Sequence, residues 1–594
     1  MTNTSDWTPD FGELNASPPT WAAKRPLRIA LLGDFGAGAL KGRLDTGADL
    51  AARRPIPVEF DSLDNAIARL ELNLQLPLGR DGANVAFDIN ELESFHPDEL
   101  YRNLKVFSSL ADLRRKLNSP TTFASAAAAL QKMAGTGAPK PRRARARGAA
   151  PSSSARLSDF ARLTGRADSL RPVSSVDALL QSLVAPYVQP AANPAKATLL
   201  ATLDTALADA MRGVLHHPEF QNLESLWRGV DFLLRRLETG PQLQVHLIDI
   251  SAEEFAADLS SVSDLVDTSL YQLLVQRPGK EAGGGYSLVC GCYQFDSSPP
   301  HAELLGRMAQ IAAQAGAPFI TAMQTEAFRE RRKPPHPLVR QAFSALQALP
   351  SAGFLSLFGP RFLQRLPYGK RSDPVSSFAF EEFTASEGLN GMLWGHPGLL
   401  AVCALVAQDS NLTLTDMPFH HVLNQHGDSV ALPCTERVLS NDTATLMRQF
   451  GIGGLLAHRG EPLVRLGALQ AVNGDQLQLN ATKTAPKKLD ARFVFSSQLP
   501  SEKRKSSAPA KADSDDADDS GNSDDDSSAS DDSNNGSSED SLDMDNLLAS
   551  MGGDENNSES SDTANSTSDY AGESTDSTND EMDPELAAML KDLQ

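Results

Sequence analysis

Apolar residues in the first 134 positions form short strand-like runs followed by a long helical stripe. The runs LRIALL (27–32), PIPVEF (55–60) and VAFDI (85–89) are typical of buried strands. From His96–Pro97–Asp98 onward, apolar residues recur at three- and four-residue steps, which predicts a helix with one buried face. That face consists of Leu100, Leu104, Phe107, Leu110, Leu113 and Leu117. We therefore expect a compact α+β unit that ends near Met133.

A further helix is predicted between the second and third strands. Asp61 is a favourable N-cap, and the sequence SLDNAIARLELNL (62–74) follows it. The earlier stretch GDFGAG (33–38) follows a strand, as dinucleotide-binding loops do. Its spacing is G-x-x-G-x-G rather than G-x-G-x-x-G, and a glycine-broken loop follows instead of a helix. We interpret GDFGAG as an ordinary turn.

A second group of elements begins near Val173. VDALLQSLV (176–184), ATLLATLDTALADAMRGVL (197–215) and EFQNLESLWRGVDFLLRRL (219–237) have helical periodicity. The apolar face of the third helix consists of Phe220, Leu223, Trp227, Val230, Leu234 and Leu237. LQVHLIDI (243–250) is a predicted strand. Ser251 and Glu254 then have the spacing of a capping box, which predicts the start of another helix.

Later elements alternate between strand and helix in the same way. YSLVCGCYQF (286–295) is strand-like, the helical stretch after it stops at Gly316, and a strand follows at 318–323. An Ala/Leu-rich helix is expected after Trp394. Further strands are predicted at 430–439, 453–459, 476–482 and 489–497. This alternation is typical of an α/β core with a buried sheet, so we predict an α/β fold preceded by the α+β unit.

Polar segments flank these two groups. Residues 1–24 form a predicted flexible leader, and residues 135–172 form a basic linker rich in proline, serine and arginine. Residues 135–156 contain five arginines but no aromatic residue on which a base would stack. A solvated linker is therefore favoured over an RNA-binding segment, and no nucleic-acid partner is predicted.

The acidic charge of the chain is confined to its end. Residues 511–594 contain 26 Asp/Glu and 2 Lys/Arg, a net charge of −24. Since the whole chain has 76 acidic and 54 basic residues, residues 1–510 contain 50 and 52, a net charge of +2. Residues 501–594 have the composition of a disordered acidic tail. The body itself carries no charge excess that would attract nucleic acid or a membrane surface.

Two apolar islands interrupt the acidic tail, at 540–553 and 583–593. In the second island Pro584 follows the plausible N-cap Asp583, which predicts a short helix. Isolated helices of this length are marginal in water, so we expect them to fold in a partner's groove. The predicted docking residues are Leu547, Leu548, Met551, Leu586, Met589, Leu590 and Leu593. A purely solubilising tail is the equally weighted alternative.

The sequence offers no motif that indicates catalysis or ligand binding. The chain contains neither a P-loop nor a G-x-S-x-G elbow. Its histidines lack metal-ligand spacing, and we interpret Cys290 and Cys292 as core thiols of a reducing compartment. No apolar run of eighteen residues and no signal-peptide pattern occurs. We therefore predict a cytoplasmic, non-enzymatic protein without metal, cofactor or membrane insertion.

Residues 26–133 resemble a known small subunit in the order of their segments. LRIALLGDFGAG, RPIPVEFDSLDNAIARLELNLQL and VAFDINELESFHPDELYRNLKVFSSLADLRRKL occur in the order found in TssB (VipA), the small sheath subunit of bacterial type VI secretion. Residues 173–499 resemble the large sheath subunit, TssC (VipB). The matching segments include LHHPEFQNLESLWRGVDFL, AGAPFIT, PRFLQRLPYG, FAFEEF and LWGHPGLLA. The resemblance thus implies two sheath-type domains, at 25–134 and 173–500, fused in one chain.

The resemblance identifies a set of signature residues that serve packing rather than chemistry. They are Trp227, Arg228, Gly229, Arg361, Arg365, Pro367, Tyr368, Gly369 and Trp394. The chain departs from the family after GALQAV (467–472), where a long helical segment normally precedes the terminal strands. Here QLQLNAT and LDARFVFSS follow almost at once. Because of this shortening, the resemblance does not extend to the family's sheath surface.

The resemblance implies a structural component of a contractile sheath. Its implied partners are further copies of itself, an inner tube protein, a baseplate and a recycling AAA+ ATPase. In the family, terminal strands complete a sheet in neighbouring protomers, a form of β-augmentation. The predicted exchange residues are Leu489, Arg492, Phe493, Val494 and Phe495. The alternative is a non-contractile adaptor or cap that regulates assembly.

Overall fold

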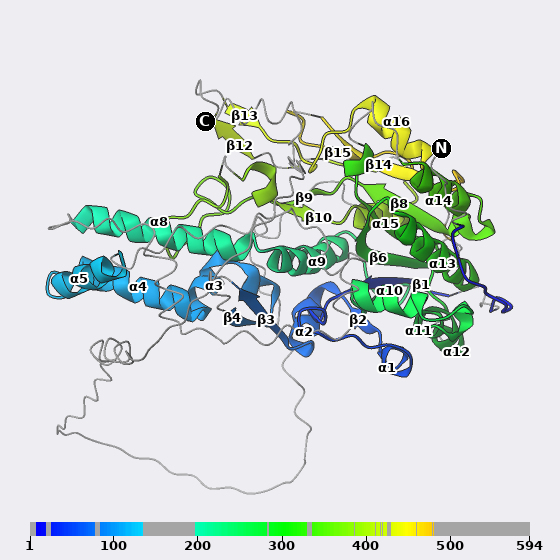
Figure 1. Ribbon diagram of the computed structural model, residues 1–594, viewed down its shortest axis with the longest axis horizontal. Coiled ribbons are helices and arrows are strands. Elements are labelled where there is room, and N and C mark those ends of the chain that lie inside the picture. Colours follow the sequence, from blue (N-terminus) through cyan, green and yellow to red (C-terminus); the bar gives the residue numbers. More distant parts are fainter. Residues whose placement is uncertain are drawn as a thin grey trace, which may run out of the picture. The chain divides into compact units, whose positions relative to one another are not determined.

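One nine-stranded sheet runs through the part of the chain that the structure describes (Figure 1). This structure is a computed structural model. It describes residues 8–19, 25–77, 84–134 and 196–479, the last range with gaps at 282–283, 329–335, 385–386, 410–411, 416, 418–419, 424–428, 459 and 478. The predicted linker, the predicted helix at 176–184, the strand at 489–497 and the acidic tail lie outside the described residues.

The centre of the sheet is parallel and its edges are antiparallel. Neighbouring strands follow the order β11-β15-β14-β8-β7-β6-β1-β5-β2. In that order, the bounds are Thr413–Leu414, Val464–Leu466, Ile452–Ala457, Leu355–Gly359, Phe319–Met323, Leu288–Phe295, Leu27–Gly33, Leu243–Asp249 and Ile56–Val58. The six strands from β14 to β5 are parallel, whereas β2, β15 and β11 pair in the antiparallel direction.

Strand β1 comes from the first segment of the chain but lies between two strands of the second. Ile29 is in register with Val245 of β5 on one side and with Leu288 of β6 on the other. Figure 1 draws it in dark blue among green strands. A strand buried on both faces of a parallel sheet reads as a continuous apolar run, as LRIALL does. The predicted small domain is therefore not self-contained, because the two segments share one sheet.

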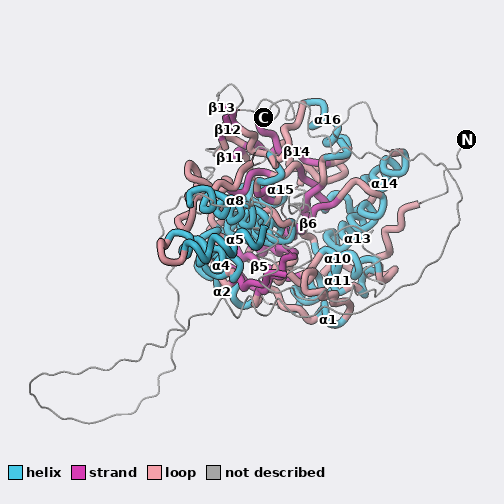
Figure 2. Tube along the Cα trace, turned by 60° about the vertical axis from the view of Figure 1, so that its left-hand side comes forward, coloured by secondary structure: helices cyan, strands magenta, loops and turns pink. Residues whose placement is uncertain are grey.

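Successive residues of β1 enter two different apolar layers. Ile29 and Leu31 pack in one core cluster, and Ala30 and Leu32 pack in the other. This follows from the alternation of side chains along a strand. Figure 2 shows the strands between one group of helices that includes α4, α5 and α8 and another that includes α10, α11, α13 and α14.

Helices from both segments cover the first face. They are α2 (Leu63–Arg69), α3 (Pro97–Asn103), α4 (Lys105–Asn118), α5 (Phe123–Ala134), α8 (Lys196–Leu215), α9 (Pro218–Leu234) and α15 (Pro397–Ala407). The second face is covered by α1 (Ala48–Ala51), α10 (Ala252–Ser260), α11 (Ser269–Tyr271), α13 (Pro299–Ala315), α14 (Pro337–Gln347) and α16 (Asn441–Gln449). The short α12 (Arg277–Lys280) follows a π-helical turn at Gln272–Gln276. Within the described residues, no helix is both long and apolar enough to cross a membrane.

Several predicted elements are confirmed. The strands at 27–32, 85–89, 243–250, 286–295 and 318–323 correspond to β1, β4, β5, β6 and β7. Ser251 and Glu254 form the predicted capping box, and Gly316 ends α13 in the left-handed conformation with φ 65°. The face from Leu100 to Leu117 is buried apart from the partly exposed Leu113, although an extended Leu104 divides it between α3 and α4.

The predicted helix at 62–74 is wrong in its second half and in its cap. Helix α2 ends at Arg69, and β3 (Leu72–Pro77) pairs with β4 (Asn84–Ile89). Leu72, Leu74 and Leu76 are buried at every second position, which is the period of a strand. The residue before α2 is Ser62 rather than Asp61, because Phe60–Ser62 form a short 3₁₀ turn capped by Glu59.

The strand predicted at 430–439 is also mostly absent. Only Ser429–Ala431 form a strand, β13, which pairs with β12 (His421–Leu423). Pro433 follows and has no backbone N–H to donate to a ladder. Thr435 makes one isolated bridge with Phe362 of β9 (Phe362–Arg365), whose regular partner is β10 (Leu393–Gly395).

Part of the predicted flexible leader is packed. Residues 8–19 lie against α13, whose Arg307, Gln310 and Gln314 donate hydrogen bonds to the carbonyl oxygens of Asp10, Phe11 and Ala16 at 3.1, 2.7 and 2.7 Å. The expectation of flexibility is therefore wrong for these residues. Asp10 also forms an ion pair with Arg307 at 2.9 Å, and Phe11 and Leu14 pack against the second core cluster. These contacts lie in a mostly polar stretch without helical or strand periodicity, so no pattern predicts them.

Candidate functional site

The two signature stretches at 215–230 and 360–382 meet in a buried ion network. Arg365 of β9 lies at its centre and is 5% exposed. Its guanidinium donates to Glu224 of α9 (Nε to Oε1, 2.7 Å) and to Glu382 (Nη1 to Oε2, 2.7 Å). Both carboxylates are fully buried. One arginine therefore joins α9, β9 and the segment FAFEEF, because a guanidinium presents five donors in a fixed fork.

A second arginine and a tyrosine close the network. Arg228 donates to Glu224 (Nε to Oε1, 2.8 Å), four residues earlier on the same helix, and to the hydroxyl of Tyr368 at 2.9 Å. Arg365 lies 4.1 Å above the Tyr368 ring, a cation–π contact. The Tyr368 N–H also donates to Glu382 Oε2 at 2.7 Å. Burial raises the pKa of Tyr368, so its hydroxyl stays protonated.

Opposite charges keep the buried carboxylate of Glu382 ionised. Burial alone would raise its pKa, but the charge of Arg365 and the contacts with His216 and Arg365 outweigh burial and lower the pKa to about 2. His216 lies between two carboxylates, with Nδ1 2.8 Å from Glu387 Oε2 and Nε2 3.5 Å from Glu382 Oε1. Burial opposes the charged form of His216, yet these two carboxylates raise its pKa.

The small-subunit-like segment contributes its own signature residues to this site. The ring of His96 packs edge-on against Tyr368, with centroids 4.9 Å apart. Asp98 accepts from the backbone N–H groups of Ser376 and Ser377 at 3.0 and 2.8 Å. Burial acts to raise the pKa of Asp98, but hydrogen bonds from both serines lower it to about 2. The motif FHPDEL is thus docked on the loop before FAFEEF.

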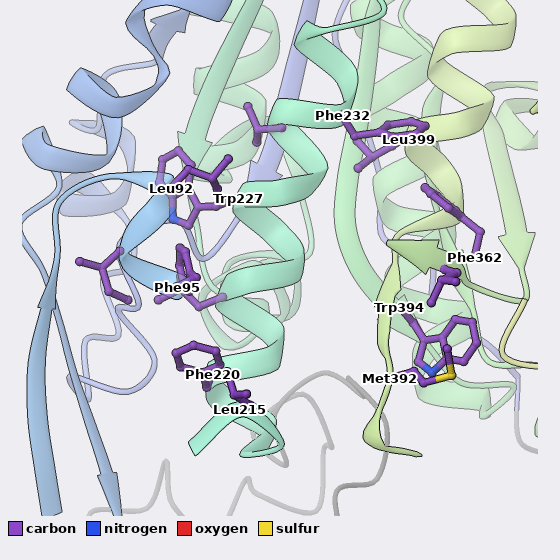
Figure 3. Packing of buried hydrophobic residues seen from close by; sticks show 14 of the residues in the cluster. Leu92, Phe95, Leu215, Phe220, Trp227, Phe232, Phe362, Met392, Trp394 and Leu399 are labelled. Atoms are coloured by element: carbon purple, nitrogen blue, oxygen red, sulfur yellow. The ribbon is translucent and has the colours of Figure 1, made fainter. Parts of the chain in front are cut away.

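An apolar layer extends the contact along α9 (Figure 3). Phe220 packs against Phe95 with ring centroids 5.5 Å apart, and Trp227 packs against Phe35 at 5.4 Å. On the other side of α9, Phe232 packs against Phe362 at 5.1 Å. No residue of α9 is exposed: its apolar residues pack on both sides of the helix, while Glu224 and Arg228 are paired within the buried network.

Close helix packing explains the glycine of the WRG signature. A Cβ atom placed on Gly229 would lie 2.6 Å from Leu399 Cδ1 of α15, closer than carbon atoms approach. The two helices therefore touch backbone to side chain at this point. A larger side chain at this position would require the buried Leu399 side chain to shift or the two helices to separate.

The remaining predicted residues lie around the network rather than in it. Arg361 pairs separately with Glu436 (Nε to Oε2, 2.8 Å). The indole N–H of Trp394 donates to the Leu389 carbonyl at 3.0 Å, and the backbone carbonyl of Trp394 accepts from Ser225 Oγ at 2.7 Å. The Pro367 carbonyl accepts from Ser372, and Gly369 lies against Glu381.

Sequence reasoning did not single out the acidic members of this site. Glu224 is four residues before Arg228, a spacing that signals a helical ion pair. The role of Glu382 had no local signal, since its partner Arg365 is 17 residues away in a different element. Asp98 was recognised only as part of a helix start, and its contact with Ser376 spans 278 residues.

Four histidines lie at the starts of helices, each followed by a proline. His–Pro pairs precede α3, α9, α14 and α15. In the first three, the Nδ1 atom of His96, His217 or His336 accepts the N–H of the second helical residue. In the described part of the chain, no group of three or more His, Cys, Asp or Glu residues is arranged to hold a metal ion. The ion network around Arg365 can rigidify the contact between the two segments, because its charged groups are paired with one another.

Comparison with known proteins agrees with a sheath-type α/β protein. Residues 197–457 match the family described as "VipB: EvpB/VC_A0108, tail sheath N-terminal domain", and residues 22–134 match "Type VI secretion system, VipA, VC_A0107 or Hcp2". The type VI secretion system sheath protein TssC1 of Pseudomonas aeruginosa is 34% identical over 214 residues, which cover 34% of this chain and 43% of that protein. The chain thus spans less than half the length of this relative. It is a fusion that belongs to the TssB (VipA) family in its first segment and the TssC (VipB) family in its second.

Proposed function

We propose that this chain is the protomer of a contractile sheath, which polymerises in the bacterial cytoplasm around an inner tube and contracts to propel it. The observation that carries the proposal is the position of β1 between β5 and β6. Both sheath families therefore contribute to one core within a single chain. A sheath has to transmit force from protomer to protomer, and a shared sheet makes the two segments one mechanical body.

The fusion fixes the two segments at one to one. In a single chain their association is intramolecular, so their effective concentration is in the millimolar range for a flexible linker of suitable length. Co-expression of residues 1–140 and 170–594 as separate chains should therefore still give a stable complex, since β1 completes the sheet. Recovery of two non-interacting monomers would contradict the fused protomer.

Strand exchange is the mode of polymerisation that we propose. Residues 489–499 would add a strand to a neighbouring protomer through Leu489, Arg492, Phe493, Val494 and Phe495. An unpaired edge strand offers its backbone groups for pairing with another chain, and heterologous contacts that do not close produce helical lattices. Deletion of residues 489–499 should leave a folded body that forms no tubes. Deletion of residues 506–594 is the matched control and should leave tubes intact.

The proposed partners beyond the chain itself are an inner tube protein, a baseplate and a recycling AAA+ ATPase. We propose that the tail islands at 540–553 and 583–593 recruit the baseplate or the ATPase. The docking residues would be Leu547, Leu548, Met551, Leu586, Met589, Leu590 and Leu593. Truncation at residue 505 should then preserve tubes but abolish firing or recycling in cells. Unchanged secretion by the truncated protein would leave only a solubilising role for the tail.

Electron microscopy of the purified full chain tests the central proposal. Extended tubes that shorten on contraction would support a contractile sheath. Rings, caps or monomers would favour the second candidate, a non-contractile adaptor that regulates assembly. One observation favours this second candidate, namely the shortened sequence after residue 472.

A further inference from the structure

A buried histidine at the junction of α8 and α9 faces two carboxylates at once. His216 follows the last residue of α8, its backbone N–H donates to the Arg212 carbonyl at 2.9 Å, and 5% of the residue is exposed. Its Nδ1 atom lies 2.8 Å from Glu387 Oε2, and its Nε2 atom lies 3.5 Å from Glu382 Oε1. Neither carboxylate belongs to α8 or α9, so the ring joins the helix junction to Glu382 and to the turn at 387–391.

Only the doubly protonated ring can donate to both carboxylates. A neutral imidazole has one N–H and one lone pair, so one of the two carboxylates would then face the lone pair. Burial opposes the charged ring, yet the contacts with Glu382 and Glu387 raise the pKa of His216 above its ordinary 6.5. The contribution of the imidazolium is therefore fully present below pH 6.5 and is lost as the pH rises through the raised pKa.

The two carboxylates depend on the ring to different degrees. Glu382 is fully buried and also accepts from Arg365 (Nη1 to Oε2, 2.7 Å) and from the Tyr368 N–H at 2.7 Å. The side chain of Glu387 is 19% exposed, so its carboxylate can exchange the imidazolium for water. A neutral ring would therefore keep its one N–H for Glu382, which has no access to water.

Glu387 begins a tight turn that leads to β10. The N–H groups of Glu387 and Gly388 donate to the Thr384 carbonyl at 3.1 and 2.9 Å, and Gly388 adopts a φ of 52°. A Cβ atom on Gly391 would lie 3.1 Å from His216 Cε1, so glycine lets the turn approach the ring closely. The ring thus contacts this turn at both of its ends.

Other titratable and charged groups surround the ring, but their charge is constant near neutral pH. Arg212 of α8 and Arg365 of β9 are guanidiniums and stay protonated. Burial lowers the pKa of His217 and of His420 to about 4, so both rings are neutral above pH 6.5. Among these named groups, the one whose charge changes above pH 6.5 is His216.

We propose that the protonation state of His216 controls whether the turn at 387–391 stays closed on the junction of α8 and α9. The imidazolium binds Glu382 and Glu387 together and keeps the turn closed. When the ring loses a proton, the remaining N–H stays with Glu382, the Glu387 carboxylate turns toward water and the turn opens locally. The rest of the network stays in place, because Glu382 keeps its bonds to Arg365. This pH-sensitive switch belongs to the single protomer and does not depend on tube assembly.

Hydrogen exchange of the full chain, read by mass spectrometry at the amides of 387–392, tests this switch. Protection is expressed relative to the intrinsic exchange rate at each pH. In the wild type it should fall several-fold as the pH rises from 6.5 toward about 9, as the sign of the raised pKa requires. His216→Gln cannot become charged, so its protection should be low and independent of pH. His458→Gln, at an exposed position, is the control and should behave as the wild type does.

Glu387→Gln is a second variant, which serves also if His216→Gln does not fold. It keeps the ring but removes one of the two charges that raise the pKa of His216, so protection should be lost at a pH lower by about one unit. A purely structural role of Glu387 would lower protection without moving this midpoint. Protection that stays constant from pH 6.5 to about 9 in the wild type would overturn the inference. Parallel pH profiles of the wild type and His216→Gln, or an unchanged midpoint in Glu387→Gln, would overturn it as well.

Discussion

Asp98 accepts hydrogen bonds from both the backbone N–H and the hydroxyl of Ser376, at 3.0 and 2.7 Å. The two residues belong to different sheath families, and 277 residues lie between them in the chain. Asp98 is 8% exposed and makes no ion pair with a lysine or arginine within the described residues. Its negative charge is stabilised mainly by serine hydroxyl and backbone N–H donors. Substitutions at Asp98 therefore report how much this contact between the two segments contributes to stability.

Replacement of Asp98 by asparagine should destabilise the protein by about 1–2 kcal/mol, because a charged acceptor of three hydrogen bonds is lost. Urea unfolding measures the effect. Because the folded-state pKa of Asp98 is about 2, below its ordinary 3.8, its contribution is present above pH 4 and disappears as the pH falls toward 2. The wild type and the variant should therefore converge in acid. Asp112→Asn, at a side chain that is 56% exposed, is the control.

Arg365→Met should be much more costly, at about 3–5 kcal/mol, because it leaves Glu224 and Glu382 buried without a shared cation. The double variant R365M/E382Q should recover part of this loss, since it removes one charge of each sign and leaves Glu224 paired with Arg228. Urea denaturation of the three proteins measures both effects. Arg115→Met, at a side chain that is 78% exposed, is the matched control, and an equal cost at both arginines would contradict the role of the network.

Local patterns predicted most elements of this fold but not their partners. LRIALL was recognised as a buried strand because a doubly covered strand is apolar throughout. Nothing in that run specifies that its neighbours are Val245 and Leu288, more than 200 residues later. Register of this kind is set by the packing of the whole sheet. The sequence therefore predicts two sheath-type domains in one chain, whereas the two segments share one sheet.

The errors at 62–74 and 8–19 have different causes. LNLQL fits both a helical continuation and a strand, and its burial at every second residue is decided by pairing with β4. The leader binds through its carbonyl groups, through the ion pair of Asp10 with Arg307 and through Phe11, which packs on the core. These isolated contacts form no periodic pattern, so the polar composition does not indicate them. In the signature site, Arg228 and Arg365 were identified by resemblance, while the carboxylates that neutralise them became visible only in three dimensions.

Gly229→Ala should destabilise the protein although alanine is the better helix former. The added Cβ would lie 2.6 Å from Leu399 Cδ1, and because Leu399 is buried its side chain must shift within a packed core, which costs about 1–3 kcal/mol. Gly213→Ala in α8 is the matched control, because no atom lies within 4 Å of its Cβ position. That substitution should stabilise the protein by about 0.5–1 kcal/mol. Thermal unfolding should therefore shift in opposite directions, and stabilisation by both substitutions would contradict close packing of α9 on α15.

His217→Asn should make the protein less sensitive to mild acid. The Nδ1 atom of His217 accepts the N–H of Glu219 at 3.3 Å, so the cap requires a neutral ring. Burial lowers the pKa of His217 to about 4, below its ordinary 6.5. The contribution of this cap is thus fully present above pH 6.5 and is lost as the pH falls toward 4, at a cost of about 1–3 kcal/mol.

Asparagine also accepts at an N-cap but does not titrate. The variant should match the wild type at pH 7.5 and lose less stability by pH 4.5 in urea unfolding. His458→Asn, at an exposed position, is the control, and parallel pH profiles for wild type and His217→Asn would show that this cap does not sense pH.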